Sequence, residues 1–538
     1  MTKDYIMRIF TVALLAMVTS CLFAGESSCF FKEGDRVGFF GDSITEAKIY
    51  GSVTELVFRH FHPQAKVSFV NNGHGGLQLA GTTVGTVVAG DPNVVTMMIG
   101  MNDAIIGSWV RGMPVEPVIA AYKAKLIALV RELKALGKEV IILTPTLTDE
   151  SVTSIFMTEG TRRLLAAMGR ACVEVAQQES APCIDVQSEF ERYEESLPRF
   201  AVLRPDGVHP CARGQYQIAR SLWTQLNLAG ALQGGRAVAS ASPELDVELT
   251  LSSNIIPSDS NDVEFSLTTP TPTTATVTWS LGKFRGSESL ALNGKTSWTI
   301  KLPANALPQS NGTSATMVVD VESHGARRLF IVDVFRKMVI HGKAGEATGA
   351  IADAQGEPLG TYLFRKDGRR LVFEASVKKK ELFQSNEDNY PWGRGDALTL
   401  YLDLRKNSAL AGLGFDGEVF QVWFKPQDKP FFSPGFLPYS GKHMANIATA
   451  YGERSADSYK VGLLLSGYVT LKEIFDVSDR EFIGFDLSII SATALGRQTW
   501  TNLQQTDRPN HLFPGTFALV DLYGKLKGDA ILTASVFP

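Results

Sequence analysis

The sequence predicts an α/β domain built on a parallel β-sheet, followed by two all-β sandwich domains. Over about residues 34–230, short apolar runs alternate with longer amphipathic ones, which is the pattern of strands and helices in turn. After about residue 245, short segments of alternating polarity are separated by Ser, Thr, Pro, Asn and Gly, which is typical of β-sandwiches. The 538 residues exceed what one hydrophobic core supports, so several domains are expected.

Composition and charge narrow the class of protein. Hydrophobic residues make up 44% of the chain and charged residues 20%, as in ordinary globular proteins. The formal net charge is −4 and the chain has no long run of Lys or Arg, so we expect no nucleic-acid partner. Besides Cys21 there are four cysteines, and this even number permits disulfides without assigning any pairing: Cys29, Cys172, Cys183 and Cys211. Their spacing shows no zinc pattern, so we expect no metal.

Residues 1–24 have the layout of a secretory signal peptide. A basic start precedes an apolar run over 9–18, and small residues follow it. The run is shorter than the roughly 20 apolar residues that span a membrane. Cleavage after Ala24 is one interpretation, and a bacterial lipoprotein box ending at Cys21 is the other. We therefore expect an exported protein, periplasmic, cell-surface or secreted, with membrane attachment only through a lipidated Cys21.

The first domain, over residues 25–233, contains strands and helices in alternation. Five apolar segments rich in Val, Ile and Phe are predicted to be buried strands, at 36–40, 66–70, 94–99, 139–143 and 183–186. Three amphipathic segments are predicted to be helices, at 117–136, 161–178 and 212–228. Such alternation predicts a parallel sheet covered by helices on both faces.

Two further domains follow a small, polar linker at 234–243. Residues 240–337 are predicted to form an Ig-like β-sandwich that acts as a spacer. Residues 338–538 are again strand-like and carry many aromatic side chains, which predicts a second β-sandwich.

A serine directly follows the first predicted strand, in the segment Gly41-Asp42-Ser43-Ile44-Thr45. Ligands of doubly wound sheets bind beyond the carboxyl ends of the strands, so Ser43 is well placed to react. Taken alone, the segment has a simpler interpretation, in which Asp42 and Ser43 only cap a helix.

Three later segments favour the nucleophile. Asn71 to Gly76 follow the second strand, Asn102 follows the third, and Asp206 and His209 precede the last helix. A serine hydroxyl needs a base to remove its proton, and His209 can serve while Asp206 holds its tautomer. The Gly76 amide and the Asn102 side chain can donate hydrogen bonds to an oxyanion.

These four blocks resemble the GDSL, or SGNH, hydrolases, over roughly residues 34–230. The resemblance implies a flavodoxin-like three-layer α/β/α fold and hydrolysis of carboxylic esters through an acyl-serine. It makes Ser43, Asp206 and His209 the catalytic residues. It also implies an oxyanion hole built from the amides of Ser43 and Gly76 with Asn102, and no metal or organic cofactor.

The C-terminal region resembles a family-nine-like carbohydrate-binding β-sandwich, on the segment 391–398, the strand that follows it and the segment 484–487. Trp392 and Trp500 are candidate glycan contacts because aromatic faces pack on sugar rings, although core packing is the commoner fate of a strand tryptophan. In the first domain, His74 and Thr146 are candidate substrate contacts. For His74, a loop histidine bonded to backbone is the alternative.

Three functions are consistent with these patterns. The first is an exported carbohydrate acetylesterase that deacylates a polysaccharide held by the C-terminal domain. The second is a lipid-directed esterase or lysophospholipase with the same triad. The third belongs to another class, a carbohydrate-binding surface protein with an inactive hydrolase domain, and the complete set of catalytic residues argues against it.

Overall fold

The computed structural model describes residues 28–109, 114–150, 160–196, 202–204, 206–232, 236, 244–253, 255–256, 261–311, 313–353, 355–379, 396–405, 419–426, 432–437, 448–455, 457–465, 468–469, 474–475, 480–492, 498–503, 517–527 and 530–538. The predicted signal peptide at 1–24, with Cys21, lies outside these ranges, as does Trp392. Within the described ranges, no helix combines the length and apolar character needed to cross a membrane. The four described cysteines are free thiols.

The first region is a parallel sheet covered by helices, as predicted. Its strands are β1 (Arg36–Gly41), β2 (Ser68–Gly73), β3 (Val94–Met98), β4 (Glu139–Leu143) and β5 (Cys183–Ile184), in the order β2-β1-β3-β4-β5. Every pairing is parallel. The strand order reverses between β1 and β3, and such a reversal opens a crevice at the carboxyl edge of the sheet.

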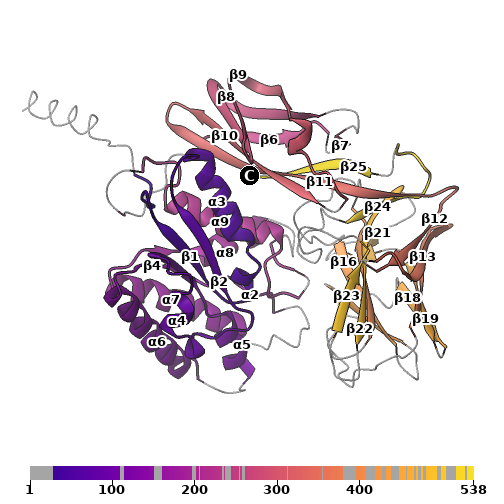
Figure 1. Ribbon diagram of the computed structural model, residues 1–538, viewed down its shortest axis with the longest axis horizontal. Helices are drawn as coiled ribbons and strands as arrows, with labels where there is room; N and C mark the ends of the chain where they lie inside the picture. Colours follow the sequence, from indigo (N-terminus) through magenta and orange to yellow (C-terminus); the bar gives the residue numbers. More distant parts are fainter. Residues whose placement is uncertain are drawn as a thin grey trace, which may run out of the picture.

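Helices connect these strands and cover both faces. They are α2 (Ser43–Glu46), α3 (Ile49–Phe61), the 3-10 turn η1 (Leu79–Gly81), α4 (Val84–Val87), α5 (Met101–Trp109), α6 (Val115–Ala135), α7 (Thr161–Gln178), α8 (Val186–Ser196) and α9 (Ala212–Gln225). Helices α3 and α9 pack together on one side of the sheet, and α6 and α7 pack together on the other (Figure 1). The three predicted helices correspond to α6, α7 and α9.

The middle region is built from strands, most of them antiparallel. They are β6 (Glu248–Leu251), β7 (Ile255–Ile256), β8 (Asp262–Leu281), β9 (Phe284–Lys301), β10 (Ser314–Ser323) and β11 (Ala326–His341), with the 3-10 turn η2 (Ala304–Ala306). Strands β8 and β9 form one long hairpin, with a register shift between Thr269 and Thr273. Alternating side chains of these strands build a hydrophobic core of their own.

The C-terminal region contains two sheets that face each other across a second core. One sheet holds β12 (Glu346–Ala352), β13 (Pro358–Asp367), β14 (Arg370–Lys378), β19 (Ser458–Leu465) and β18 (Ala448–Arg454). The other holds β15 (Ala397–Asp403), β16 (Val419–Pro426), β17 (Phe432–Leu437), β22 (Phe482–Ala492), β23 (Gln498–Asn502) and β24 (Ala518–Asp521). A small hairpin joins β20 (Tyr468–Val469) to β21 (Ile474–Phe475).

The middle and C-terminal regions share strands. The amino-terminal part of β11 pairs with β10, and its carboxyl end pairs with β24. The last strand, β25 (Ala530–Phe537), returns to the middle region and pairs with β11 and β7. The boundary predicted between residues 337 and 338 therefore lies inside a continuous strand, because β11 runs through both regions.

The middle region also packs firmly on the first one. The core of the first region includes buried side chains of β10, β11 and β25, namely Val318, Leu329, Ile331, Phe335 and Phe537. The Tyr216 hydroxyl of α9 donates a hydrogen bond to the buried Asp333 carboxylate of β11. Figure 1 shows β8 to β11 lying beside α3 and α9. These two helices are therefore held between the parallel sheet and the middle region.

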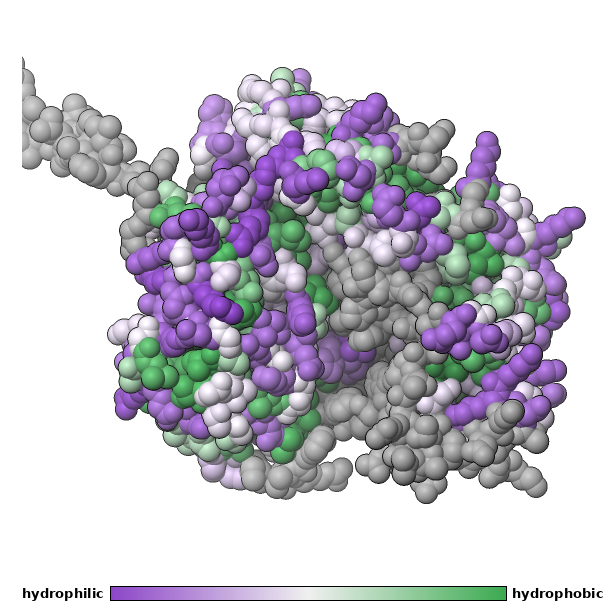
Figure 2. Space-filling view, viewed as in Figure 1, coloured by the Kyte–Doolittle hydropathy of each residue, from purple (hydrophilic) through white to green (hydrophobic). Residues whose placement is uncertain are grey.

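Polar side chains cover most of the visible face of the described part, and hydrophobic ones gather there in small separate groups (Figure 2). Among the described residues, the large hydrophobic side chains that are exposed are Ile106, Leu136 and Tyr523. The apolar side chains of the described helices and strands are thus mostly directed into the three cores.

Candidate active site

The turn after β1 holds Ser43 at the carboxyl edge of the sheet. The Asp42 carboxylate accepts a hydrogen bond from the Ile44 N–H at 3.0 Å, so Asp42 caps α2. A Cβ atom on Gly41 would lie 2.2 Å from Thr45 Oγ1 and 2.4 Å from the Met98 carbonyl oxygen. Only glycine fits at that position, and the tight turn leaves Ser43 partly exposed.

A serine, a histidine and an aspartate form a connected chain at this edge. Ser43 Oγ lies 2.9 Å from His209 Nε2. His209 Nδ1 lies 2.9 Å from Asp206 Oδ2. The other carboxylate oxygen of Asp206 accepts hydrogen bonds from the N–H groups of Val208 and His209, both at 2.9 Å. The carboxylate thus fixes both the backbone of this loop and the orientation of the ring.

The loop that carries Asp206 and His209 is closed by main-chain bonds. The Arg204 N–H donates to the His209 carbonyl at 2.7 Å, and the Gly207 N–H donates to the Arg204 carbonyl at 2.9 Å. The Asp149 N–H, beyond the end of β4, donates to the Gly207 carbonyl at 2.8 Å. The base is therefore presented by a braced loop immediately before α9.

Asp206 is held as a carboxylate. Its burial alone would raise its pKa, but the charges of Arg204 and His209 and the hydrogen bonds from His209 outweigh that effect. The pKa of Asp206 consequently lies well below its usual range. An ionised Asp206 can stabilise a protonated imidazole at His209.

Arg204 contacts this centre although the sequence pattern did not indicate it. Its Nη1 lies 3.3 Å from Asp206 Oδ2, the same oxygen that faces His209. Its side chain is 10% exposed. In the sequence, Arg204 stands two positions before Asp206. That spacing alone does not distinguish a buried partner of the carboxylate from an exposed loop arginine.

Two glycine-containing segments surround Ser43 from neighbouring strand ends. Asn71, at the end of β2, donates from its side-chain amide to the Thr45 carbonyl at 2.7 Å. Gly76 follows with φ +73° and an exposed backbone. Asn102, in the first turn of α5, donates from Nδ2 to the Leu77 carbonyl at 3.0 Å. Since an amide nitrogen carries two hydrogens, the second can point elsewhere.

Asp103 braces the loop that follows β2. Its two carboxylate oxygens lie 3.1 and 3.0 Å from the Leu79 nitrogen and accept from its N–H. Burial raises the pKa of Asp103 despite these hydrogen bonds. Burial likewise raises the pKa of Asp42, to about 6. Asp42 fixes the backbone of the nucleophile turn, whereas Asp103, which interacts electrostatically with Asp42, fixes the backbone of η1.

The candidate substrate contacts occupy different environments. His74 is exposed, and its backbone N–H donates to the Gly41 carbonyl at 3.0 Å. Thr146 is fully buried, and its hydroxyl has no hydrogen-bond partner among the described residues. Trp500 lies in β23 and pairs with Ile490, but its side chain is outside the description, as is all of Trp392.

Within the described part of the chain, no cluster of three metal-binding side chains occurs.

Comparisons with known proteins find matches to the first region of the chain. A sequence model of the GDSL-like Lipase/Acylhydrolase family matches residues 39–216. An acetylxylan esterase from Geobacillus stearothermophilus is 28% identical over 217 residues, which are 36% of this chain and 94% of the relative. Among solved structures, a catalytic mutant of Axe2, an acetylxylan esterase from that species, is 24% identical with a TM-score of 0.32. The match covers 36% of this chain and 95% of the Axe2 chain. The hydrolase LAE5 from the metagenome of Lake Arreo, Spain, is 23% identical with a TM-score of 0.33, covering 38% of this chain and 99% of its own.

The parallel sheet, in the order β2-β1-β3-β4-β5, and its covering helices form a doubly wound α/β domain, and the polar groups of the candidate site lie at one edge of it. The N-terminal region is a hydrolase domain of the GDSL, or SGNH, type, and the protein is a carboxylic ester hydrolase. The predicted enzyme class is thereby confirmed.

Proposed function

We propose that this protein is an exported carbohydrate acetylesterase in which Ser43, His209 and Asp206 carry out acyl transfer. The observation that carries the proposal is the continuous chain of short contacts, 2.9 Å from Ser43 Oγ to His209 Nε2 and 2.9 Å from His209 Nδ1 to Asp206 Oδ2. This is the geometry that a nucleophile, a base and an orienting acid require.

The proposed reaction has two halves. His209 Nε2 accepts the Ser43 proton while Oγ attacks the ester carbonyl, and Asp206 stabilises the imidazolium. The oxyanion accepts hydrogen bonds from the Ser43 and Gly76 amides and the Asn102 side chain. The imidazolium then protonates the departing alcohol and leaves an acyl-serine. In the second half, His209 takes a proton from water as the water oxygen attacks the acyl carbon. The imidazolium then returns the proton to Ser43 Oγ as that oxygen leaves, which releases the carboxylic acid and restores Ser43.

The choice of a carbohydrate substrate has two supports. The curated relative is an acetylxylan esterase, and it covers the same region of the chain. The C-terminal pair of sheets is the part that resembles a carbohydrate-binding sandwich in sequence, and we propose that it binds glycan. Export would follow from the signal-like residues 1–24, with Cys21 as the alternative lipid attachment point. Fractionation of expressing cells and detection of a lipidated Cys21 by mass spectrometry test this location.

A lipid-directed esterase is the second candidate, because the family that matches residues 39–216 is described as lipase and acylhydrolase. The two functions differ in the acyl group and in the alcohol. An acetylesterase cleaves short esters on a glycan, whereas a lipid-directed enzyme favours long acyl chains.

A substrate panel separates the two functions. The full chain is assayed on acetylated xylan, on other acetylated polysaccharides, on p-nitrophenyl esters of increasing chain length and on a lysophospholipid. We expect acetate release from at least one glycan and a preference for the acetyl ester. Preference for long-chain esters or the lysophospholipid, with no acetate released from any glycan, would contradict the carbohydrate proposal in favour of the lipid one. Absence of turnover on every ester would contradict both.

A further inference from the structure

The Asp206 carboxylate is shared between two cations. His209 Nδ1 lies 2.9 Å from Oδ2, and Arg204 Nη1 lies 3.3 Å from the same oxygen. The side chains of Arg204 and Asp206 are 10% and 6% exposed. Because little water reaches this pair, the positive charge of Arg204 is felt strongly at Asp206 and beyond it at His209.

Arg204 also interacts electrostatically with the C-terminal region. The charge of Arg204 acts on the phenol of Tyr401, whose pKa is nevertheless raised by burial. Tyr401 lies in β15 and is 2% exposed. Its neighbours along that strand, Leu400 and Leu402, belong to the core between the two C-terminal sheets. Tyr401 therefore lies on the opposite face of β15, since successive side chains of a strand alternate, and there its ring packs against Phe517.

We propose that Arg204 is a positioning residue of the ester hydrolase centre and that Tyr401 of the C-terminal sheet shields Arg204 from water. Arg204 would hold Asp206 in line with His209 and would partly neutralise the carboxylate. The C-terminal region would then complete the catalytic centre as well as carrying any glycan-binding surface. This inference rests on the proposed roles of Asp206 and His209.

Several charged or titratable groups face this centre. The nucleophile turn contributes Asp42, which interacts electrostatically with His209, and α5 contributes Asp103, which acts on Asp42. The loop contributes Arg204 and Asp206. The C-terminal sheet contributes Tyr401 on β15, on which Arg204 and also Asp486 of β22 act. Among these groups, Arg204 carries the one fixed positive charge. Its removal should therefore leave the Asp206 carboxylate free to favour the protonated imidazole.

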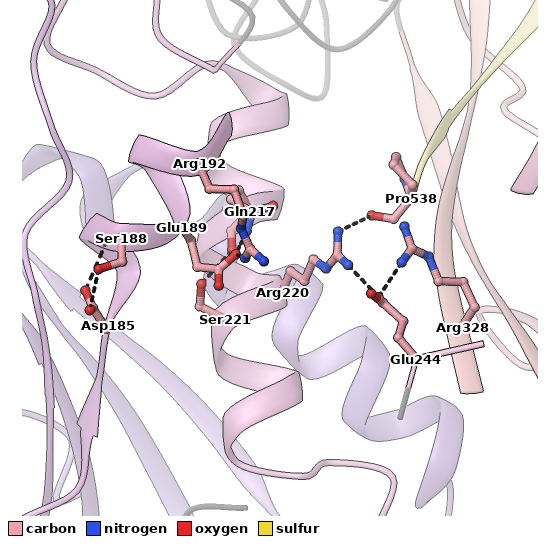
Figure 3. Close-up of polar contacts among 10 residues, drawn as sticks. All are labelled: Asp185, Ser188, Glu189, Arg192, Gln217, Arg220, Ser221, Glu244, Arg328 and Pro538. Atoms are coloured by element: carbon pink, nitrogen blue, oxygen red, sulfur yellow. Dashed lines mark hydrogen bonds and ion pairs between the residues drawn. The ribbon is translucent and has the colours of Figure 1, made fainter. Parts of the chain in front are cut away.

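The test measures the titration of the His209 ring directly, by NMR of full-length protein with labelled histidine, using His209→Ala to assign the signal. The same variants are assayed for kcat/KM against pH. Arg204→Met removes the charge with much of the side-chain length retained, and Arg204→Lys keeps the charge. Arg220→Met is the matched control. As Figure 3 shows, Arg220 of α9 lies where the first region meets the middle region: it contacts Glu244 and the Pro538 carbonyl, and Glu244 also contacts Arg328.

In Arg204→Met we expect the His209 titration midpoint and the acidic limb of kcat/KM to move upward by about half a pH unit or more. In Arg204→Lys and Arg220→Met we expect both to stay near the wild-type position. An unchanged midpoint in a folded Arg204→Met variant would overturn the proposal. A shifted midpoint in a protein without turnover on any ester would instead contradict the proposed function and leave the electrostatic role of Arg204 standing.

A double-mutant cycle tests the part assigned to Tyr401. Tyr401→Leu should let water approach Arg204 and weaken its electrostatic effect on Asp206. The His209 titration midpoint should therefore move upward, as in Arg204→Met, but by a smaller amount. Tyr401→Leu combined with Arg204→Met should shift no further than Arg204→Met alone, because both changes act through one charge. Additive shifts would show that Tyr401 acts independently of Arg204 and would overturn this part of the proposal. If Tyr401→Leu does not fold, Tyr401→Ile, which also removes the ring, takes its place in the same cycle.

Discussion

Ser43 Oγ and His209 Nε2 lie 2.9 Å apart although 166 positions separate the two residues in the sequence. The packing of α3 against α9 brings them together. Gln215 of α9 donates from its amide to the Ile44 carbonyl at 3.1 Å and accepts from the Tyr50 N–H at 3.3 Å. One buried side chain therefore connects the helix that follows His209 to the turn that carries Ser43.

Replacing Asn102 by Ala should reduce kcat by roughly 10²–10³-fold while KM changes little, because an oxyanion donor acts mainly in the transition state. Steady-state kinetics on p-nitrophenyl acetate measure both constants. A raised KM at unchanged kcat would show instead that Asn102 binds the ground state. The Leu77 carbonyl loses its bond from Nδ2 in this variant, so thermal unfolding must also be compared.

His209→Ala should lose at least as much activity as Asp206→Ala. Only His209 moves the proton, whereas Asp206 orients the ring and stabilises its charge. The comparison uses kcat/KM on one ester at a pH where both variants remain folded. A larger loss in Asp206→Ala would mean that the two roles are assigned the wrong way round.

Tyr216→Phe should destabilise the protein by about 1–3 kcal/mol, because the buried Asp333 carboxylate loses a donor. Asp333 keeps its bond from Thr316 Oγ1 at 2.5 Å. Denaturant unfolding measures the change. Tyr523→Phe is the matched control because Tyr523 is 40% exposed and its ring remains available to Lys366. Equal stability of the two variants would show that the bond between α9 and β11 contributes nothing.

Acidification should loosen the contact between α3 and the middle region. His60 lies 2.8 Å from Ser280 Oγ and 3.2 Å from Thr278 Oγ1, and burial, with the charges of Arg285 and Arg327, lowers the pKa of His60 to about 4. The unfolded chain takes up this proton near pH 6.5, before the folded protein does. Stability is therefore lost as pH falls from about 6.5 toward 4, by up to roughly 3 kcal/mol.

His60→Gln should flatten this dependence, since glutamine does not titrate. The measurement is the change in Tm between pH 7 and pH 5 for the wild type and the variant. His324→Gln serves as the control because His324 is exposed, and it should behave like the wild type. A drop in Tm of His60→Gln that equals the wild-type drop would contradict the assignment to His60.

Much of the first region could be predicted because its signals are local. The apolar runs that became β1 to β5 and the amphipathic runs that became α6, α7 and α9 each carry their own periodicity. The nucleophile turn could be predicted because Gly41 and Ser43 follow a buried strand directly. The Asp206 and His209 pair could be predicted because both lie in one short loop before a helix.

The remaining features depend on contacts between distant segments. Nothing in the sequence around β25 indicates that it returns to β11, since a short apolar strand fits either β region equally well. His60 sits at the end of an ordinary amphipathic helix, and its buried partners come from β8. The ion pair of Arg204 with Asp206 depends on how the loop folds back, and the electrostatic interaction of Arg204 with Tyr401 depends on how the domains pack.

The central claim is that Ser43 is the nucleophile, and Ser43→Ala tests it most directly. The assay follows hydrolysis of p-nitrophenyl acetate and release of acetate from an acetylated glycan, with Ser52→Ala as the control because Ser52 is an exposed serine on α3. We predict that Ser43→Ala keeps the wild-type Tm within a few degrees and loses turnover of both substrates, while Ser52→Ala retains it. Undiminished turnover in a folded Ser43→Ala protein would contradict the account.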